Sequence, residues 1–168
     1  AKDMGMDMVV NCAACYSRLI MAKHEVETSA ATKAKVEKVL QARIDELPKV
    51  LNVIELLAQV SDRIAAKVTK KFEQTVACYY GCLLVRPAKV TGATDVEAPQ
   101  SMERVLRLIG AEPVRWSMAM ECCGASFGVA RTQVVIRQGR RVFDAAKSAG
   151  ADVFCLACPM CHANLDMR

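Results

Sequence analysis

Several features are scarce in this sequence, and each scarcity narrows what the protein can do. Aromatic residues make up 5% of the 168 residues, and the excess of 23 basic over 18 acidic side chains is small and scattered. A nucleic-acid-binding surface would concentrate lysine and arginine in one stripe with interleaved aromatic rings. We therefore expect no nucleic acid partner, although a mildly basic surface suits an anionic substrate or an acidic partner protein.

Long apolar runs and nucleotide-binding motifs are also lacking. No apolar run approaches the roughly 18–20 residues of a membrane-spanning helix, and the first residues show no targeting signal. Residues 124–128 form a turn into a helix but lack the dinucleotide fingerprint, and no Ser/His/Asp arrangement is apparent. We expect a cytoplasmic protein with no membrane span and no flavin or nicotinamide bound by this chain.

Cysteine, by contrast, is abundant. The chain has nine cysteines, an odd number, and most of them fall in C-x2-C or Cys-Cys groups. A secreted disulfide scaffold would spread its cysteines through a short chain rich in loops. With 53% hydrophobic residues, this chain can build an ordinary core. The grouping therefore favours metal chemistry in a reducing cytosol.

The second half of the chain alternates between strand and helix patterns, which predicts an α/β fold with a small parallel sheet and flanking helices. The expected strands are 74–80, 113–118 and 152–156. The expected helices are 101–108, 128–149 and a short one after Cys161. Before this region we expect a strand at 6–10 and helices at 16–27, 30–45, 50–58 and 61–70.

Cysteines follow each of the three expected strands in the second half. Cys82 follows the first strand, Cys122 and Cys123 precede Gly124 after the second, and Cys158 and Cys161 follow the third. The carboxyl ends of parallel strands meet at one edge of a sheet, where ligands collect. We therefore expect these five thiols to converge in a three-layer-like cysteine-rich domain. Five thiolates exceed what one tetrahedral zinc ion needs and fit an iron–sulfur cluster better.

The start of the chain echoes its end. Residues 5–15 and 150–161 share Gly-x-Asp, a short apolar strand and C-x2-C, which indicates two copies of one unit. The first copy is present only as its tail, without an upstream cysteine or a Cys-Cys-Gly of its own. The expected division is therefore an incomplete first domain at 1–27, a helical connection at 28–71 and a complete cysteine-rich domain at 72–168.

The remaining candidate residues carry competing interpretations. Cys78 and Cys155 lie inside strands, where a role as small core residues is favoured. Cys12 and Cys15 form an incomplete second site, and free thiols or a disulfide are equally good interpretations of them. His162 follows Cys161 and could donate a proton, contact a substrate or simply cap a helix. Arg86 could attract a substrate anion or form a salt bridge.

Three strings resemble the B-type subunit of heterodisulfide reductase, a family of proteins with cysteine-rich (CCG) domains. The strings are Cys78-Tyr79-Tyr80-Gly81-Cys82-Leu83-Leu84-Val85-Arg86-Pro87, Glu121-Cys122-Cys123-Gly124-Ala125 and Cys158-Pro159-Met160-Cys161-His162-Ala163-Asn164-Leu165-Asp166. The segment from Cys12 and Cys15 to Leu19 is similar to the end of that subunit's first cysteine-rich domain. The resemblance covers nearly the whole chain, but only the last part of the first domain.

The resemblance implies an oxidoreductase that acts on disulfides. Members of the family hold a non-cubane [4Fe–4S] cluster through five cysteines, which here would be Cys82, Cys122, Cys123, Cys158 and Cys161. Paired clusters split a disulfide between coenzyme M and coenzyme B, or an analogous disulfide, with electrons from flavin-containing and ferredoxin-like iron–sulfur subunits. Because the first unit is incomplete here, the resemblance also implies a fragment of the full catalytic subunit.

Two alternatives to this function stay open at the level of the sequence. The cysteines could hold zinc in a structural or docking module of an electron-transfer complex. A metal-free dithiol exchange protein could instead use C-x2-C alone.

Overall fold

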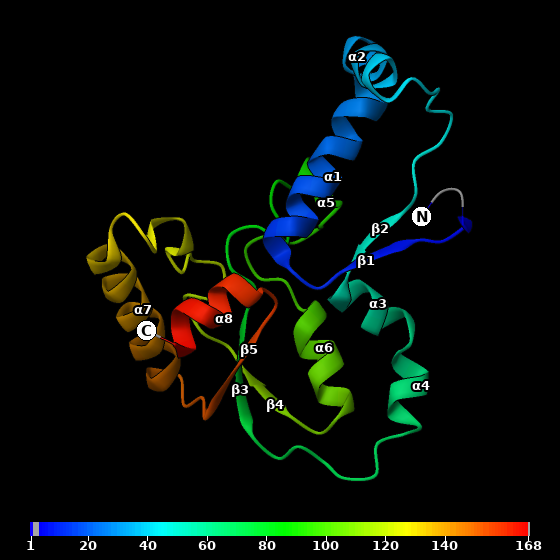
Figure 1. Ribbon diagram of the computed structural model, residues 1–168. Helices are drawn as coiled ribbons and strands as arrows, with labels where there is room; N and C mark the ends of the chain where they lie inside the picture. The colour runs from blue at the N-terminus through cyan, green and yellow to red at the C-terminus, as the bar shows by residue number, and fades with distance from the viewer. Residues whose placement is uncertain (2–3, 168) are drawn as a thin grey trace.

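The computed structural model describes residues 1 and 4–167 and consists of two parallel sheets joined by helices. In Figure 1 the N-terminal sheet and the long helix α1 lie above the C-terminal sheet, and α8 sits where the two halves meet. The expected α/β class with small parallel sheets and flanking helices is confirmed. Among the described residues, no helix is long and apolar enough to cross a membrane.

The N-terminal sheet has two strands, β1 (Met8–Val10) and β2 (Val50–Asn52), which pair in parallel. Between them the chain forms α1 (Ala13–Thr28) and α2 (Ala30–Leu40). The Ser29 side chain accepts a hydrogen bond from the Thr32 amide, which makes Ser29 the N-cap of the second helix. Gln41 adopts φ 52° and ends that helix at Leu40, five residues before the predicted end at 45.

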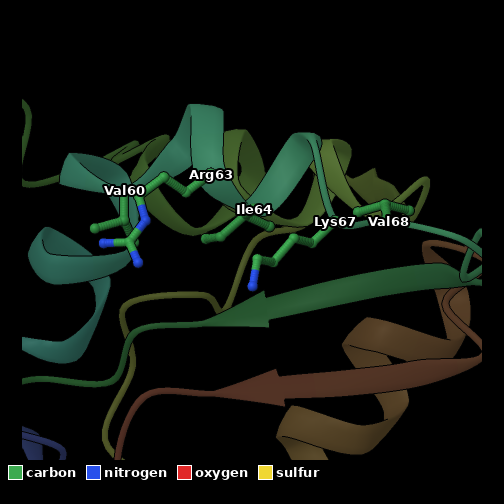
Figure 2. Close-up of a pocket in the computed structure, with 5 residues that line it drawn as sticks. All are labelled: Val60, Arg63, Ile64, Lys67 and Val68. Atoms are coloured by element: carbon green, nitrogen blue, oxygen red, sulfur yellow. The ribbon is translucent and has the colours of Figure 1, made fainter.

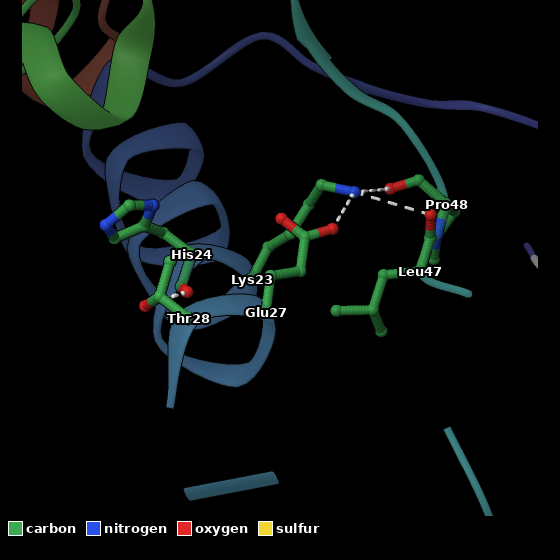
Figure 3. Close-up of polar contacts among 6 residues, drawn as sticks. All are labelled: Lys23, His24, Glu27, Thr28, Leu47 and Pro48. Atoms are coloured by element: carbon green, nitrogen blue, oxygen red, sulfur yellow. Dashed lines mark hydrogen bonds and ion pairs between the residues drawn. The ribbon is translucent and has the colours of Figure 1, made fainter. Parts of the chain in front are cut away.

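Lys23 of α1 binds the segment that leads into β2. The Lys23 ammonium pairs with Glu27 at 2.9 Å and donates to the carbonyls of Leu47 and Pro48 at 3.4 and 3.3 Å (Figure 3). These bonds satisfy carbonyls just before the strand begins. They hold the returning chain beside the helix on its way to the sheet.

The prediction of a helix over residues 50–58 was wrong at its start. Val50–Asn52 form strand β2, and helix α3 (Val53–Gln59) begins directly after it. The switch occurs at Asn52, whose side chain accepts from the Glu55 amide while Glu55 accepts from the Asn52 amide, a capping box. The next helix, α4 (Ser61–Ala65), is shorter than predicted.

The C-terminal sheet has the strand order β4-β3-β5, with all strands parallel. Its strands are β3 (Thr75–Tyr79), β4 (Glu112–Val114) and β5 (Val153–Leu156). The helices around it are α5 (Ala88–Thr91), α6 (Ser101–Leu108), the 3₁₀ turn η2 (Ala125–Phe127), α7 (Thr132–Ser148) and α8 (Pro159–Asp166). The second strand is shorter than predicted, and the long helix begins at Thr132, four residues later than predicted.

Successive residues of the central strand β3 face opposite layers. Cys78 pairs in register with Cys155 on the face that Glu103 of α6 approaches. On the other face Phe154 packs edge-on against Phe143 of α7, with ring centroids 5.2 Å apart. Figure 1 shows α6 on one side of this sheet and α7 with α8 on the other, giving three layers.

A single apolar core connects the two sheets. Ala13, Tyr16 and Ile20 of α1 and Ile54 of α3 belong to the same buried cluster as Tyr79 and the other core residues of the C-terminal sheet. The first helix is therefore packed into the core that supports the cysteine-bearing loops.

Candidate functional site

The Cys122-Cys123-Gly124 turn sends its two cysteine side chains to different surroundings. Cys123 is buried at 3% exposure, whereas Cys122 is exposed. Gly124 has φ +80°, a conformation that strains any residue with a Cβ, and its amide donates to the Cys122 sulfur at 3.3 Å. The turn thus presents one sulfur inward and one outward, as expected for two adjacent ligands that contact different metal atoms.

The buried sulfur of Cys123 lies 3.2 Å from that of Cys161. The hydrogen bond from Cys161 lowers the pKa of Cys123 to about 6, although burial opposes the change, and the amide of Ala125 and the side chain of Asn164 assist. The hydrogen bonds to Cys123 and Cys158 and burial raise the pKa of Cys161. These cysteines come from the loop after β4 and from α8, so the predicted approach of two strand ends is present.

Cys158 occupies the N-cap position of α8. A hydrogen bond from the Cys161 side chain lowers the pKa of Cys158 to about 4 against the effect of burial, and the amides of Cys161, Ala14 and Met160 add to it. Amides at a helix N-terminus commonly stabilise a thiolate in this way. Two of the five thiols are therefore predisposed to the anionic form that binds metals.

Cys82 joins the group from the loop after β3. Burial raises its pKa to about 11, and the neighbouring sulfurs of Cys122 and Cys123 act in the same direction. Gly81 precedes it with φ +66°, and a Cβ at that position would lie 3.5 Å from the Cys161 sulfur. The backbone therefore approaches the sulfurs closely on this side, and all five cysteines expected from the sequence lie near one another.

The role of these five cysteines as ligands stays a prediction. Within residues 1 and 4–167, no set of three or more His, Cys, Asp or Glu side chains has the arrangement of a site for a single metal ion. What the structure shows is the meeting of five thiols at the carboxyl edge of one parallel sheet.

Two buried polar side chains beside the thiols were not singled out by sequence reasoning. The Tyr79 hydroxyl donates to the Glu121 carbonyl at 2.7 Å, and the Asn164 amide nitrogen donates to the Cys123 carbonyl at 3.3 Å. Helix periodicity could have identified Asn164, because it lies three residues after Cys161 on the same face. The tyrosine gave no comparable signal.

The N-terminal pair lies next to the five thiols. Burial raises the pKa of Cys12, and Cys158 is among the neighbouring groups that add to this effect. Cys15 is exposed. The backbone amide of Ala14, which lies between the two cysteines in the sequence, lowers the pKa of Cys158. The segment that carries Cys12 and Cys15 therefore lies beside the C-terminal cysteines.

The remaining candidates lie further out or in the core. Arg86 pairs with Glu97 at 2.7 Å, the salt bridge offered as its alternative role. His162 is largely exposed and lies 3.5 Å from Asp166. Cys78 is fully buried. Burial and the Glu103 carboxylate raise the pKa of both Cys78 and Cys155. Both thiols therefore favour the neutral form that is typical of core cysteines.

One surface cavity lies beside α4 and another along β5. A cavity of about 450 Å³ beside α4 is lined by Val60, Arg63, Ile64, Lys67 and Val68 (Figure 2). A cavity of about 520 Å³ along β5 includes Cys155, Cys158 and His162. The cavity along β5 adjoins the cysteine group, whereas the residues that line the cavity beside α4 include none of the site candidates.

Comparison with known proteins agrees with this arrangement. A family model described as a cysteine-rich domain, CCG, matches residues 76–166, which contain all five cysteines. The chain is 28% identical over 173 residues to the B-type subunit of the ferredoxin/F(420)H(2)-dependent CoB-CoM heterodisulfide reductase of Methanosarcina acetivorans, covering 99% of this chain and 58% of the relative. It is equally similar to the corresponding subunit of the ferredoxin:CoB-CoM heterodisulfide reductase of Methanosarcina mazei.

A relative named for a different activity is also similar to this chain. The chain is 25% identical over 171 residues to the 8-methylmenaquinol:fumarate reductase membrane anchor subunit of Wolinella succinogenes, covering 99% of this chain and 60% of that protein. The chain thus spans about three fifths of the length of these curated relatives.

Proposed function

Because the chain belongs to the cysteine-rich (CCG) domain family, we propose that it is a subunit of an electron-transfer complex that reduces a disulfide. Residues 72–168 would form the complete cysteine-rich domain, 1–27 the tail of a first one, and 28–71 the connection. The observation that carries the proposal is the convergence of five thiols from three strand ends. Two relatives named as heterodisulfide reductase subunits support the choice of a disulfide as substrate.

The donor set fits an iron–sulfur cluster of the non-cubane [4Fe–4S] type. Thiolate is the ligand that such clusters use, and Cys123 and Cys158 have lowered pKa values that favour thiolates at neutral pH. The ligands would be Cys82, Cys122, Cys123, Cys158 and Cys161. At Gly81 the backbone approaches the sulfurs closely, since a Cβ there would lie 3.5 Å from the Cys161 sulfur, whereas Gly124 approaches Val135 of α7.

When bound, the cluster would supply electrons to the substrate disulfide one at a time. Reduction of the disulfide consumes two electrons and two protons, breaks the S–S bond and releases two thiols. Cys122 is the exposed member of the set, so the outward side of the turn is where substrate would approach. Exposed His162 could donate one proton, while Arg86 would have to leave Glu97 to bind an anionic substrate.

The N-terminal pair would contribute to a second site facing the first. The charge of Cys158 adds to the effect of burial in raising the pKa of Cys12, and the Ala14 amide reaches the Cys158 sulfur. Cys12 and Cys15 would be the ligands that this chain supplies to the second site. Electrons would arrive from flavin-containing and ferredoxin-like iron–sulfur subunits of the same complex.

The test is metal analysis of protein purified without oxygen. We expect iron and sulfide in near-equal amounts and a broad visible absorption, both lost in Cys123→Ser. Cys155→Ser is the matched control, because that cysteine faces α6 and should leave iron content unchanged. Zinc without iron would contradict the proposal and favour a zinc-binding docking module.

Dithiol exchange is a second candidate, favoured by one observation. The Cys123 and Cys161 sulfurs lie 3.2 Å apart, and the lowered pKa of Cys123 would make it the attacking thiolate. In that reaction the two thiols would give two electrons and two protons to a substrate disulfide and form a disulfide themselves. Protein without any metal that reduces a model disulfide stoichiometrically would support this function.

A further inference from the structure

The Cys122-Cys123 turn is held from two sides by buried side chains. The Tyr79 hydroxyl donates to the carbonyl of Glu121, just before the two cysteines, and Asn164 donates to the carbonyl of Cys123 itself. Tyr79 is 1% exposed and Asn164 9%, so neither bond competes freely with water. The carbonyls on both sides of Cys122 are therefore fixed by groups outside the turn.

The two donors come from the elements that carry the other three cysteines. Tyr79 ends β3, three residues before Cys82, and Asn164 lies on α8, one helical turn after Cys161. The turn has no strand or α-helix of its own from 121 to 124. Backbone bonds from the Tyr80 and Gly81 amides to the Ala119 carbonyl, at 2.9 and 3.1 Å, hold the segment that leads into the turn. The two side-chain bonds act further along, at the carbonyls of Glu121 and Cys123 in the turn itself.

A core role alone does not account for the Tyr79 hydroxyl. Its ring packs near Trp116 with centroids 6.0 Å apart, a contact that phenylalanine would keep. The ring also faces the cysteines, since Cys161, Cys123, Cys122 and Cys82 add to the effect of burial in raising the pKa of Tyr79. The hydroxyl at the end of this ring reaches the turn that carries two of those sulfurs.

Asn164 has a second contact with the group. Its amide nitrogen lies 3.9 Å from the Cys123 sulfur, as well as 3.3 Å from the Cys123 carbonyl. Donors near cysteine sulfur favour extra negative charge there and raise the reduction potential of a bound cluster. Asn164 can therefore influence both the position of the turn and the charge on its inner sulfur.

We propose that Tyr79 and Asn164 are positioning residues that clamp the Cys122-Cys123 turn against β3 and α8. For metal-free protein the clamp keeps Cys123 buried beside Cys161. In a protein that holds a cluster, which rests on the proposed function above, it keeps two ligands in register with the other three. Asn164 also makes such a cluster easier to reduce.

The hydroxyl of Tyr79 can be tested against a closely matched neighbour. Tyr80 is also 1% exposed, and its hydroxyl bonds to Glu103 and the Met102 amide on the opposite face of the sheet. Tyr79→Phe and Tyr80→Phe each remove one buried hydroxyl, and Tyr80→Phe should lower the global stability at least as much because it leaves the Glu103 carboxylate and the Met102 amide without that partner. Only Tyr79→Phe should release the turn.

The first measurement uses metal-free, reduced protein. It determines the rate at which iodoacetamide alkylates Cys123, and mass spectrometry assigns the label to Cys123 within the peptide that contains it. Loss of one hydrogen bond should raise this rate about three- to tenfold in Tyr79→Phe and less than twofold in Tyr80→Phe. Equal rates in the two variants would overturn the clamp. This readout does not depend on iron, so it decides the clamp even where wild-type protein binds no cluster and the proposed function fails.

The second measurement uses the reconstituted, cluster-loaded protein. Release of iron to a chelator should be several-fold faster in Tyr79→Phe than in Tyr80→Phe. For Asn164, the variant Asn164→Asp removes a donor and adds a negative charge, so the reduction potential should fall. Ala163→Asp places the same charge on an exposed position of α8, and an equal fall in both variants would refute the specific role of Asn164.

Discussion

At the scale of single residues, neighbouring thiols acquire opposite proton affinities from their contacts. The pKa of Cys158 falls to about 4 because Cys161 and backbone amides donate to it, whereas burial, reinforced by the neighbouring sulfurs of Cys122 and Cys123, raises the pKa of Cys82 to about 11. Residue type alone does not predict this difference in pKa, because all these side chains are cysteines with the same ordinary pKa. The folded backbone makes some of them ready ligands at neutral pH.

Glycine positions give a direct test of backbone conformation. Gly110 and Gly150 both follow helices with φ near +80°, but a Cβ at Gly110 would lie 2.8 Å from the Lys71 Cβ, whereas a Cβ at Gly150 meets no atom within 4 Å. Alanine should cost about 1 kcal/mol at Gly150 from backbone strain. At Gly110 the added crowding should raise the loss to roughly 2–4 kcal/mol. Urea unfolding of Gly110→Ala and Gly150→Ala measures both, and equal losses would contradict the crowding.

The five cysteines could be predicted from the sequence because each follows a strand pattern, and parallel strands bring their carboxyl ends together. The clamp could not be predicted in the same way. The bonds of Tyr79 to Glu121 and of Asn164 to Cys123 join residues about 40 positions apart. Such pairs depend on how the loops settle on the sheet, which local pattern does not specify.

At the scale of elements, strand β2 shows where local pattern fails. Residues 50–58 are a nearly continuous apolar run, which fits either a buried strand or a helix. Pairing with β1, more than 40 residues away, makes the first three residues a strand. The capping box at Asn52 then starts α3, a signal that was visible in the sequence as Asn52 followed by Glu55. Helix α6, by contrast, ends at Leu108 as predicted, but Ser101, which was expected to be its N-cap, is its first residue, and Gln100 occupies the N-cap position.

The packing of α1 on α3 carries a testable dependence on pH. Burial, followed by the charge of Glu55, raises the pKa of Tyr16 to about 12. Because the folded pKa exceeds the unfolded value of about 10, the stabilising effect is fully present below pH 10 and lost as the pH rises through 12. The Tyr16 hydroxyl donates to the Glu55 carboxylate at 3.4 Å.

Tyr16→Phe should therefore cost about 1 kcal/mol below pH 10. The difference from wild type should shrink as the pH rises from 10 towards 12, because the wild-type protein alone loses the Tyr16 contribution. Urea unfolding at several pH values measures this difference, with Thr28→Ala as a control at an exposed hydroxyl. A difference that stays constant over this range would show that Tyr16 keeps its ordinary pKa.

At the scale of the whole molecule, the start of α1 meets the start of α8. Cys12 and the Ala14 amide lie near Cys158, and α1 shares the apolar core of the C-terminal sheet. The division at 27 and 71, drawn from the echo between residues 5–15 and 150–161, stays a prediction. The shared core predicts that these segments unfold as one cooperative unit.

That cooperativity can be measured with the single tryptophan. Trp116 packs near Tyr79 and Phe154, so its fluorescence reports the C-terminal sheet. Ile20 lies in α1 and is 7% exposed within the shared core. Ile20→Ala should remove about 2–4 kcal/mol of stability and shift the fluorescence and far-ultraviolet circular dichroism transitions together.

The matched control is Val39→Ala, because Val39 on α2 is 81% exposed and should leave both transitions unchanged. If the N-terminal segment unfolded independently, Ile20→Ala would move the circular dichroism transition and leave the Trp116 transition in place. Coincident shifts would instead show that α1 stabilises the sheet that carries the cysteines. Loosening α1 should then also loosen the contact between Ala14 and Cys158, since Ala14 lies in the first turn of that helix.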